Sequence, residues 1–101
     1  MRYYNRAGEP ISYVQWRRLF EDKRYQVVRQ TEVGEVMVST VWLGMDHGWG
    51  EEHGPIIFET MIFGLEGDQD AEQYRYADEE TALVDHEHLV QQLQLLRRAV
   101  E

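Results

Sequence analysis

Two eight-residue apolar stretches constrain the fold more than any other feature of the sequence. They are VMVSTVWL at residues 36–43 and IIFETMIF at residues 56–63. Both are rich in β-branched and aromatic side chains and contain neither proline nor glycine, which is typical of β-strands. Because each stretch is apolar on both of its faces, we expect the two strands to lie inside one sheet and not at its edge.

The loop that joins these stretches, GMDHGWGEEHG at residues 44–54, is polar and rich in glycine. A loop held between two rigid strands is a natural place for binding or for chemistry. Its glycines do not form a phosphate-binding loop, because the pattern lacks the lysine that such loops carry. The loop therefore marks a candidate site without identifying a reaction.

Helical patterns lie on either side of this region. Ser12 and Gln15 form the S-x-x-Q pattern of a capping box, which predicts a helix near 12–21. Its expected buried stripe is Val14, Trp16, Leu19 and Phe20. A longer helix near 79–99, capped by Asp78, is predicted by apolar residues at three- and four-residue steps. These are Ala82, His86, Leu89, Val90, Leu93, Leu96 and Val100.

The remaining patterns complete a meander. We expect a hairpin or extended arm at the N-terminus, strands near 25–32, 35–43 and 55–63, and a short edge strand at Tyr74–Tyr76. Gly34 should supply the positive φ of a tight turn. The predicted fold is α+β, a single domain over residues 1–101. Its antiparallel β-meander of three to five strands carries both helices, near 12–21 and 79–99, packed on one face. The expected core is Trp16, Phe20, Val38, Trp42, Phe58, Ile62, Leu89 and Leu93.

Charge is distributed unevenly along the chain. Residues 1–43 hold five acidic and seven basic residues, whereas residues 44–101 hold fourteen acidic and three basic ones. Direct binding to nucleic acid or to anionic lipid needs clusters of Lys and Arg, which the sequence lacks. The acidic half either keeps a small protein in solution or meets a basic partner.

The expected location is the cytoplasm. The sequence has no cysteine, which fits a reducing compartment. No run approaches the length of a membrane span, and no apolar segment follows the charged N-terminus as in a secretory signal.

Four segments of the sequence resemble a set of small proteins from actinobacteria and their phages. The segments are Y-x-N-R-A-G-E-P-I-S-x-x-x-W, V-S-T-V-W-L-G-M-D-H, F-E-T-M-I-F-G and A-L-x-x-H-E. The resemblance covers most of the chain and implies a fold and a genomic setting, but no activity and no site. In a phage setting the protein would act in the cytoplasm of the host cell and would bind a host or phage protein.

Our first functional hypothesis is a protein-binding module without a cofactor. Residues 66–80 hold seven acids against one arginine, so they could engage a basic, nucleic-acid-binding partner by resembling a phosphate track. The candidate contact residues are Trp49, Asp68, Asp70, Glu72, Tyr74 and Tyr76. Two apolar strands with only two helices could also leave one sheet face bare, which a symmetric homodimer would cover.

The alternative hypothesis is an enzyme with its site around residues 44–59. Asp46, His47, His53 and His86 offer the oxygen and nitrogen ligands that a divalent transition metal takes. Glu59, if buried with His47 or Arg29, could act as a general base in a hydrolase. The simpler interpretations are that His86 is a histidine at the core edge and that Glu59 lies in water. The sequence therefore favours the binding module over the enzyme.

Overall fold

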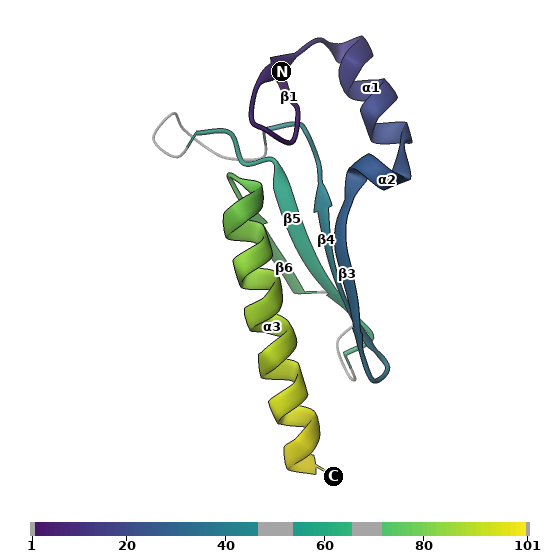
Figure 1. The fold of residues 1–101 in the computed structure, drawn as a ribbon, viewed down its shortest axis with the longest axis vertical. Helices are drawn as coiled ribbons and strands as arrows, with labels where there is room; N and C mark the ends of the chain where they lie inside the picture. The colour runs from purple at the N-terminus through teal and green to yellow at the C-terminus, as the bar shows by residue number, and fades with distance from the viewer. Residues whose placement is uncertain (1, 47–53, 66–71, 101) are drawn as a thin grey trace.

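The computed structural model describes residues 2–46, 54–65 and 72–100 and shows an α+β fold (Figure 1). In chain order the elements are β1 (Tyr3–Tyr4), β2 (Pro10–Ile11), α1 (Tyr13–Glu21), α2 (Lys23–Gln26), β3 (Val27–Val33), β4 (Val36–Trp42), β5 (Phe58–Phe63), β6 (Glu72–Tyr76) and α3 (Glu79–Val100). Strands β1 and β2 form a small hairpin, and β3-β4-β5-β6 form an antiparallel sheet in sequence order. The predicted meander is therefore confirmed.

The two apolar stretches form the central strands of this sheet. Met37 pairs with Phe63 at one end of the β4–β5 ladder and Trp42 pairs with Phe58 at the other. Side chains alternate between the faces of a strand, so each ladder pair lies on one side of the sheet. The turn from β3 to β4 passes through Gly34 at φ 63°, the positive φ that was expected.

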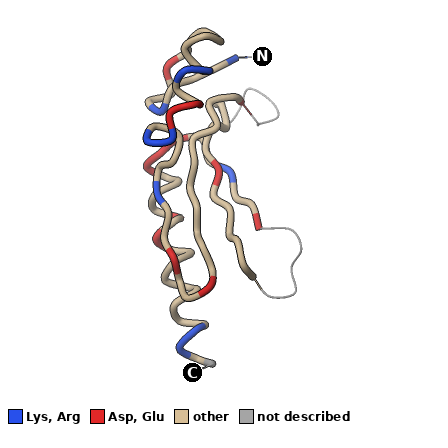
Figure 2. Tube along the Cα trace, turned by 90° about the vertical axis from the view of Figure 1, so that its right-hand side faces the viewer, with Lys and Arg blue, Asp and Glu red and all other residues tan. Residues whose placement is uncertain are grey.

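Both predicted helices lie on the same side of the sheet, as expected (Figure 2). Helix α3 runs along the sheet and contacts all four strands, whereas α1 lies at one end. The capping box of α1 is formed: the amide of Gln15 donates to Ser12 Oγ at 3.2 Å, and the amide of Ser12 donates to Gln15 Oε1 at 2.9 Å.

Helix α1 docks through fewer residues than the sequence suggested. Trp16, Leu19 and Phe20 pack toward Trp42, but Val14 is 57% exposed, so its predicted burial is wrong. A helix this short buries only one stripe, and Val14 lies off the one that Trp16, Leu19 and Phe20 define.

A short helix, α2, precedes β3 where the sequence suggested that the strand had already begun. Asp22 caps α2 by accepting from the amide of Arg24 at 3.1 Å. Tyr25 in α2 meets the ring of Trp42 edge-on, with ring centroids 5.0 Å apart.

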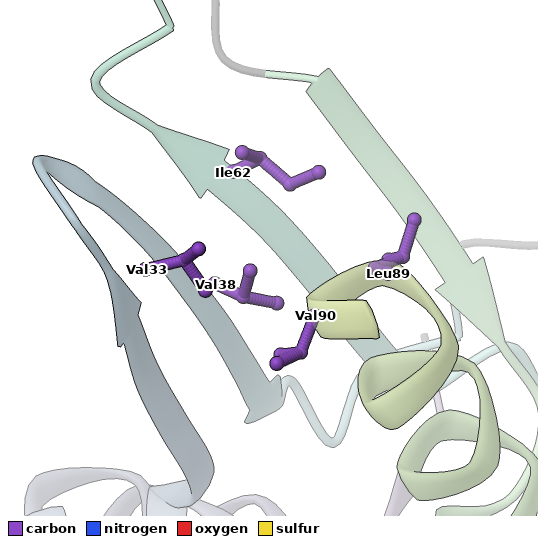
Figure 3. Packing of buried hydrophobic residues seen from close by; sticks show 5 residues of the cluster. All are labelled: Val33, Val38, Ile62, Leu89 and Val90. Carbon is purple, nitrogen blue, oxygen red and sulfur yellow. The ribbon is translucent and has the colours of Figure 1, made fainter. Parts of the chain in front are cut away.

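The core consists of two apolar clusters instead of one. The first cluster (Val33, Val38, Ile62, Leu89 and Val90) lies between α3 and the half of the sheet near the β3–β4 turn (Figure 3). The second (Trp42, Ile57, Phe58 and Ala82) lies at the other end, where partly buried Trp16 and Phe20 join it. Fully buried His86 of α3 packs against the sheet between these halves. No described helix is long and apolar enough to span a membrane.

Candidate functional site

A buried polar layer surrounds His86. The hydroxyl of Thr31 lies 2.8 Å from His86 Nε2, and the hydroxyl of Thr40 lies 2.7 Å from His86 Nδ1. Thr40 also reaches the hydroxyl of Thr60 at 2.6 Å. Because β3, β4 and β5 each contribute one threonine to the helix-covered face, the layer ties three strands to α3.

This environment keeps His86 neutral. Burial lowers the pKa of His86, and nearby Arg29 lowers it further, whereas Glu87 acts in the opposite direction. Both ring nitrogens already have hydroxyl partners, so a metal could bind either nitrogen only by breaking one of these contacts. The arrangement matches the simpler interpretation, a structural histidine, with threonine hydroxyls as its partners.

Asp46 is the other proposed metal ligand that the structure describes. Asp46 accepts from the amide of Ile56 at 2.9 Å, at the edge of the loop. His47 and His53 lie outside the described residues, so the metal prediction stays a prediction at these positions. Within residues 2–46, 54–65 and 72–100, no three His, Asp or Glu side chains form a group that could hold a metal ion.

Glu59 lies on the opposite face of the sheet from His86. It is only 9% exposed, so the favoured interpretation that it lies in water is wrong. Its direct neighbour in the β5–β6 register is Arg75, whose Nε donates to the Glu59 carboxylate at 3.1 Å. Arg29 instead bonds Glu87 of α3 at 2.7 Å. Glu59 and His86 therefore do not form an acid–base pair.

The acidic candidates on β6 are partly engaged within the chain. The hydroxyl of Tyr74 donates to Glu72 at 2.7 Å, and that of Tyr76 donates to Asp85 on α3. Burial raises the pKa of Tyr76, and its bond to Asp85 raises it further. The two tyrosines are half-buried and help to join β6 to α3. Trp49, Asp68 and Asp70 lie outside the described residues.

The first two turns of α3 form one side of an open hollow of about 580 Å³. Its walls are Arg6, Ala7, Glu79, Glu80, Leu83 and Val84. Arg6 is fixed in place: its Nε donates to Glu79 at 2.5 Å and its Nη1 donates to the carbonyl of Tyr25 at 3.1 Å. The hollow therefore has a rigid rim, with apolar walls at Ala7, Leu83 and Val84.

Val84 is the residue at this site that the sequence reasoning missed. Its side chain is 67% exposed, and exposed Glu80 and Glu87 lie one turn away on either side of it. We name Asp78, Glu79, Glu80, Val84 and Glu87 the acidic corner. The sequence signal for this site was an apolar residue, Val84, on the polar face of the predicted helix.

Comparisons with protein-family models, curated proteins and solved structures found no match to the chain. The resemblance to small actinobacterial and phage proteins thus stays a prediction.

Proposed function

We propose that the protein is a binding module that docks a protein partner with a basic surface through the acidic corner. The observation that carries this proposal is exposed Val84 between Glu80 and Glu87, beside the hollow. An apolar anchor gives affinity when it is desolvated at the centre of an interface, and surrounding charges steer the partner and select it.

The hollow fits the basic side chains of such a partner. The methylene stem of a lysine or arginine can lie against Ala7, Leu83 and Val84 while its charged end reaches exposed Glu80. The chain carries a net charge of −9, which favours association with basic proteins. The proposal includes the phage-type setting, with the host cytoplasm as its location and a nucleic-acid-binding protein as its partner.

A matched pair of charge reversals tests the site. Binding of labelled lysine- and arginine-rich peptides should be measured by fluorescence anisotropy at low and high salt. Glu80→Lys should weaken binding about tenfold, which corresponds to about 1.4 kcal/mol, and should flatten the salt dependence. Glu21→Lys on α1 changes the net charge equally at an exposed position away from the hollow, and it should leave binding close to that of the wild type.

A second variant separates anchoring from charge. Val84→Ser keeps the charge of the acidic corner and removes its apolar anchor, so dissociation should become faster while association stays unchanged.

Charge reversal at Asp68, Asp70 and Glu72 tests whether the surface extends along residues 66–80. Equal losses for Glu80→Lys and Glu21→Lys would show that only net charge matters and would reject the acidic corner as a site.

A further inference from the structure

The apolar stripe that docks α3 continues past the end of the sheet. It advances by alternating four- and three-residue steps through Ala82, His86, Leu89, Leu93 and Leu96. The first three of these residues are buried and Leu93 is half-buried, but Leu96 is 65% exposed. Figure 1 shows the reason, because the last turns of α3 extend beyond the strands. The sequence expectation that Leu96 is buried is therefore wrong for the single chain.

Leu96 borders an apolar groove of about 760 Å³ at this end of the molecule. Leu93, Leu96 and Arg97 of α3 form one side, and the β3–β4 turn (33–36) with Gly64 and Leu65 forms the other. Val33 belongs to the first apolar cluster, against which Val36, Leu65 and Leu93 also pack. The groove therefore opens directly onto the hydrophobic core.

The two rims of the groove carry opposite charges. Exposed Glu35 lies on the side of the β3–β4 turn, with exposed Glu32 in the adjoining hollow, and exposed Arg98 lies next to the groove at the end of the helix. The guanidinium of Arg97 reaches across to the turn, where a Cβ on Gly34 would lie 3.0 Å from its Cζ. A two-fold rotation brings the basic rim of one copy beside the acidic rim of another, so such a surface is complementary to itself. A partner of a single charge sign would match only one rim.

We infer that a second copy of this chain occupies the groove and forms a two-fold symmetric dimer. The ends of the two α3 helices cross, and Leu96 of each copy enters the groove of the other, with Arg98 opposite Glu35. Covering a large exposed apolar side chain in this way gives an interface its anchor.

The other candidate for a dimer surface is the sheet face opposite α3, on which the sequence expectation of a homodimer was based. In the part of the chain that the structure describes, this face carries the Glu59–Arg75 ion pair and the hydrogen bond from Gln30 to Ser39. Burying an ion pair costs desolvation energy that the attraction within the pair often does no more than offset. The same face also carries Phe63, which is 45% exposed, but Leu96 beside the groove is 65% exposed, so we prefer the groove as the dimer surface.

This inference does not depend on the function proposed above. The acidic corner lies at the N-terminal end of α3 and the groove at its C-terminal end (Figure 1). The dimer therefore leaves both corners open and directs them away from the shared end, so that it can engage two basic sites at once.

Sedimentation equilibrium over a wide range of micromolar concentrations tests the dimer. The wild type should approach twice the chain mass of 12.0 kDa. Leu96→Glu should weaken the dimer by about thirtyfold or more, the effect of losing an interface anchor. Val14→Glu introduces the same charge at an exposed apolar position of α1, away from the groove, and it should dimerise as the wild type does.

Charge exchange provides a test that loss of folding cannot imitate. Glu35→Arg should weaken the dimer, and adding Arg98→Glu to that variant should restore it. Circular dichroism should show that every variant stays folded, since all of these positions are exposed. A wild type that stays at the chain mass throughout, or a dimer that Leu96→Glu leaves unchanged, would overturn the inference.

Discussion

Gly44 allows two tryptophans to approach each other at the end of the sheet. A Cβ at this position would lie 2.4 Å from Cζ2 of Trp42 and 2.5 Å from Cδ1 of Trp16. Its φ of +75° is also one that side-chain-bearing residues rarely adopt. Trp16 Nε1 donates to the carbonyl of Leu43 at 2.9 Å and so holds its ring against the glycine. Both space and backbone conformation therefore require glycine here.

A comparison of two glycines separates these requirements. Gly54 has a similar φ of +64°, but a Cβ there would meet nothing within 4 Å. Gly44→Ala should therefore lower the free energy of unfolding by about 1–3 kcal/mol more than Gly54→Ala, through overpacking between the tryptophans. Urea denaturation of the two variants measures the difference. Equal losses would mean that the rings move aside at little cost.

The buried site of His86 predicts how the protein responds to acid. Its pKa is lowered in the folded state, so between that pKa and the unfolded value of about 6.5 the unfolded chain binds more protons. The contribution of His86 to stability is complete above about pH 6.5 and is lost as the pH falls toward the folded pKa.

Nuclear magnetic resonance can follow the His86 ring directly. The titration midpoint of His86 should lie below about pH 6.5, where an unperturbed imidazole is half protonated. A midpoint at or above that pH would contradict the effect of burial. Carboxylates also contribute to acid unfolding, so the ring resonances report on this group more specifically than a melting curve does.

At the level of elements, α3 is held by the buried half of its apolar stripe. Leu89 is buried against the first cluster, whereas Leu95 on the same helix is 64% exposed. Leu89→Ala should lower the free energy of unfolding by about 2–5 kcal/mol. Leu95→Ala should change it by less than about 0.5 kcal/mol, because it is a surface substitution. Similar midpoints in urea for the two variants would show that α3 is not held by this contact.

The elements that could be predicted are those with a strong local signal. The periodicity of α3, the capping box of α1 and the β-branched composition of β4 and β5 are properties of short segments, and all four elements formed as expected. Helix α2 has only four residues, too few to show a helical period, so β3 was expected to start too early.

Contacts that depend on register or on element length could not be predicted in this way. Thr40 meets Thr60, and Glu59 meets Arg75, only because β4, β5 and β6 pair in one particular register. The exposure of Leu96 depends on where the strands end relative to α3, which the helix pattern does not contain. The polar layer around His86 also depends on strand register, and it emerged only from the structure.

At the level of the whole molecule, excess negative charge outweighs the ion pairs. The ion pairs among described residues include Arg6–Glu79, Arg17–Glu21, Arg29–Glu87 and Arg75–Glu59. Most of the side chains in these pairs are well exposed, and exposed pairs contribute little to stability. The net charge of −9 causes repulsion across the molecule, and salt screens repulsion of this range.

Added salt should therefore stabilise the fold. The melting temperature at low protein concentration should rise by several degrees as NaCl is increased to about 0.15 M, where the screening length falls to about 8 Å. KCl should have the same effect, which would exclude a specific role for sodium. A falling melting temperature would mean that the ion pairs contribute more than the repulsion between like charges.

The N-terminal arm has a consequence for the rates of folding and unfolding. The four-stranded sheet pairs only strands that follow one another in the chain, so its contacts close short loops. The contact of Arg6 with Glu79 instead joins residues 73 positions apart, and Tyr4 accepts from Trp42 Nε1 at 3.0 Å across 38 positions. Closing such long loops costs chain entropy until the sheet and α3 are in place, so we expect these contacts to be absent from the folding transition state. Interactions of this kind slow unfolding and leave the folding rate almost unchanged. The arm then determines how long a folded molecule persists, while the meander determines how quickly it forms.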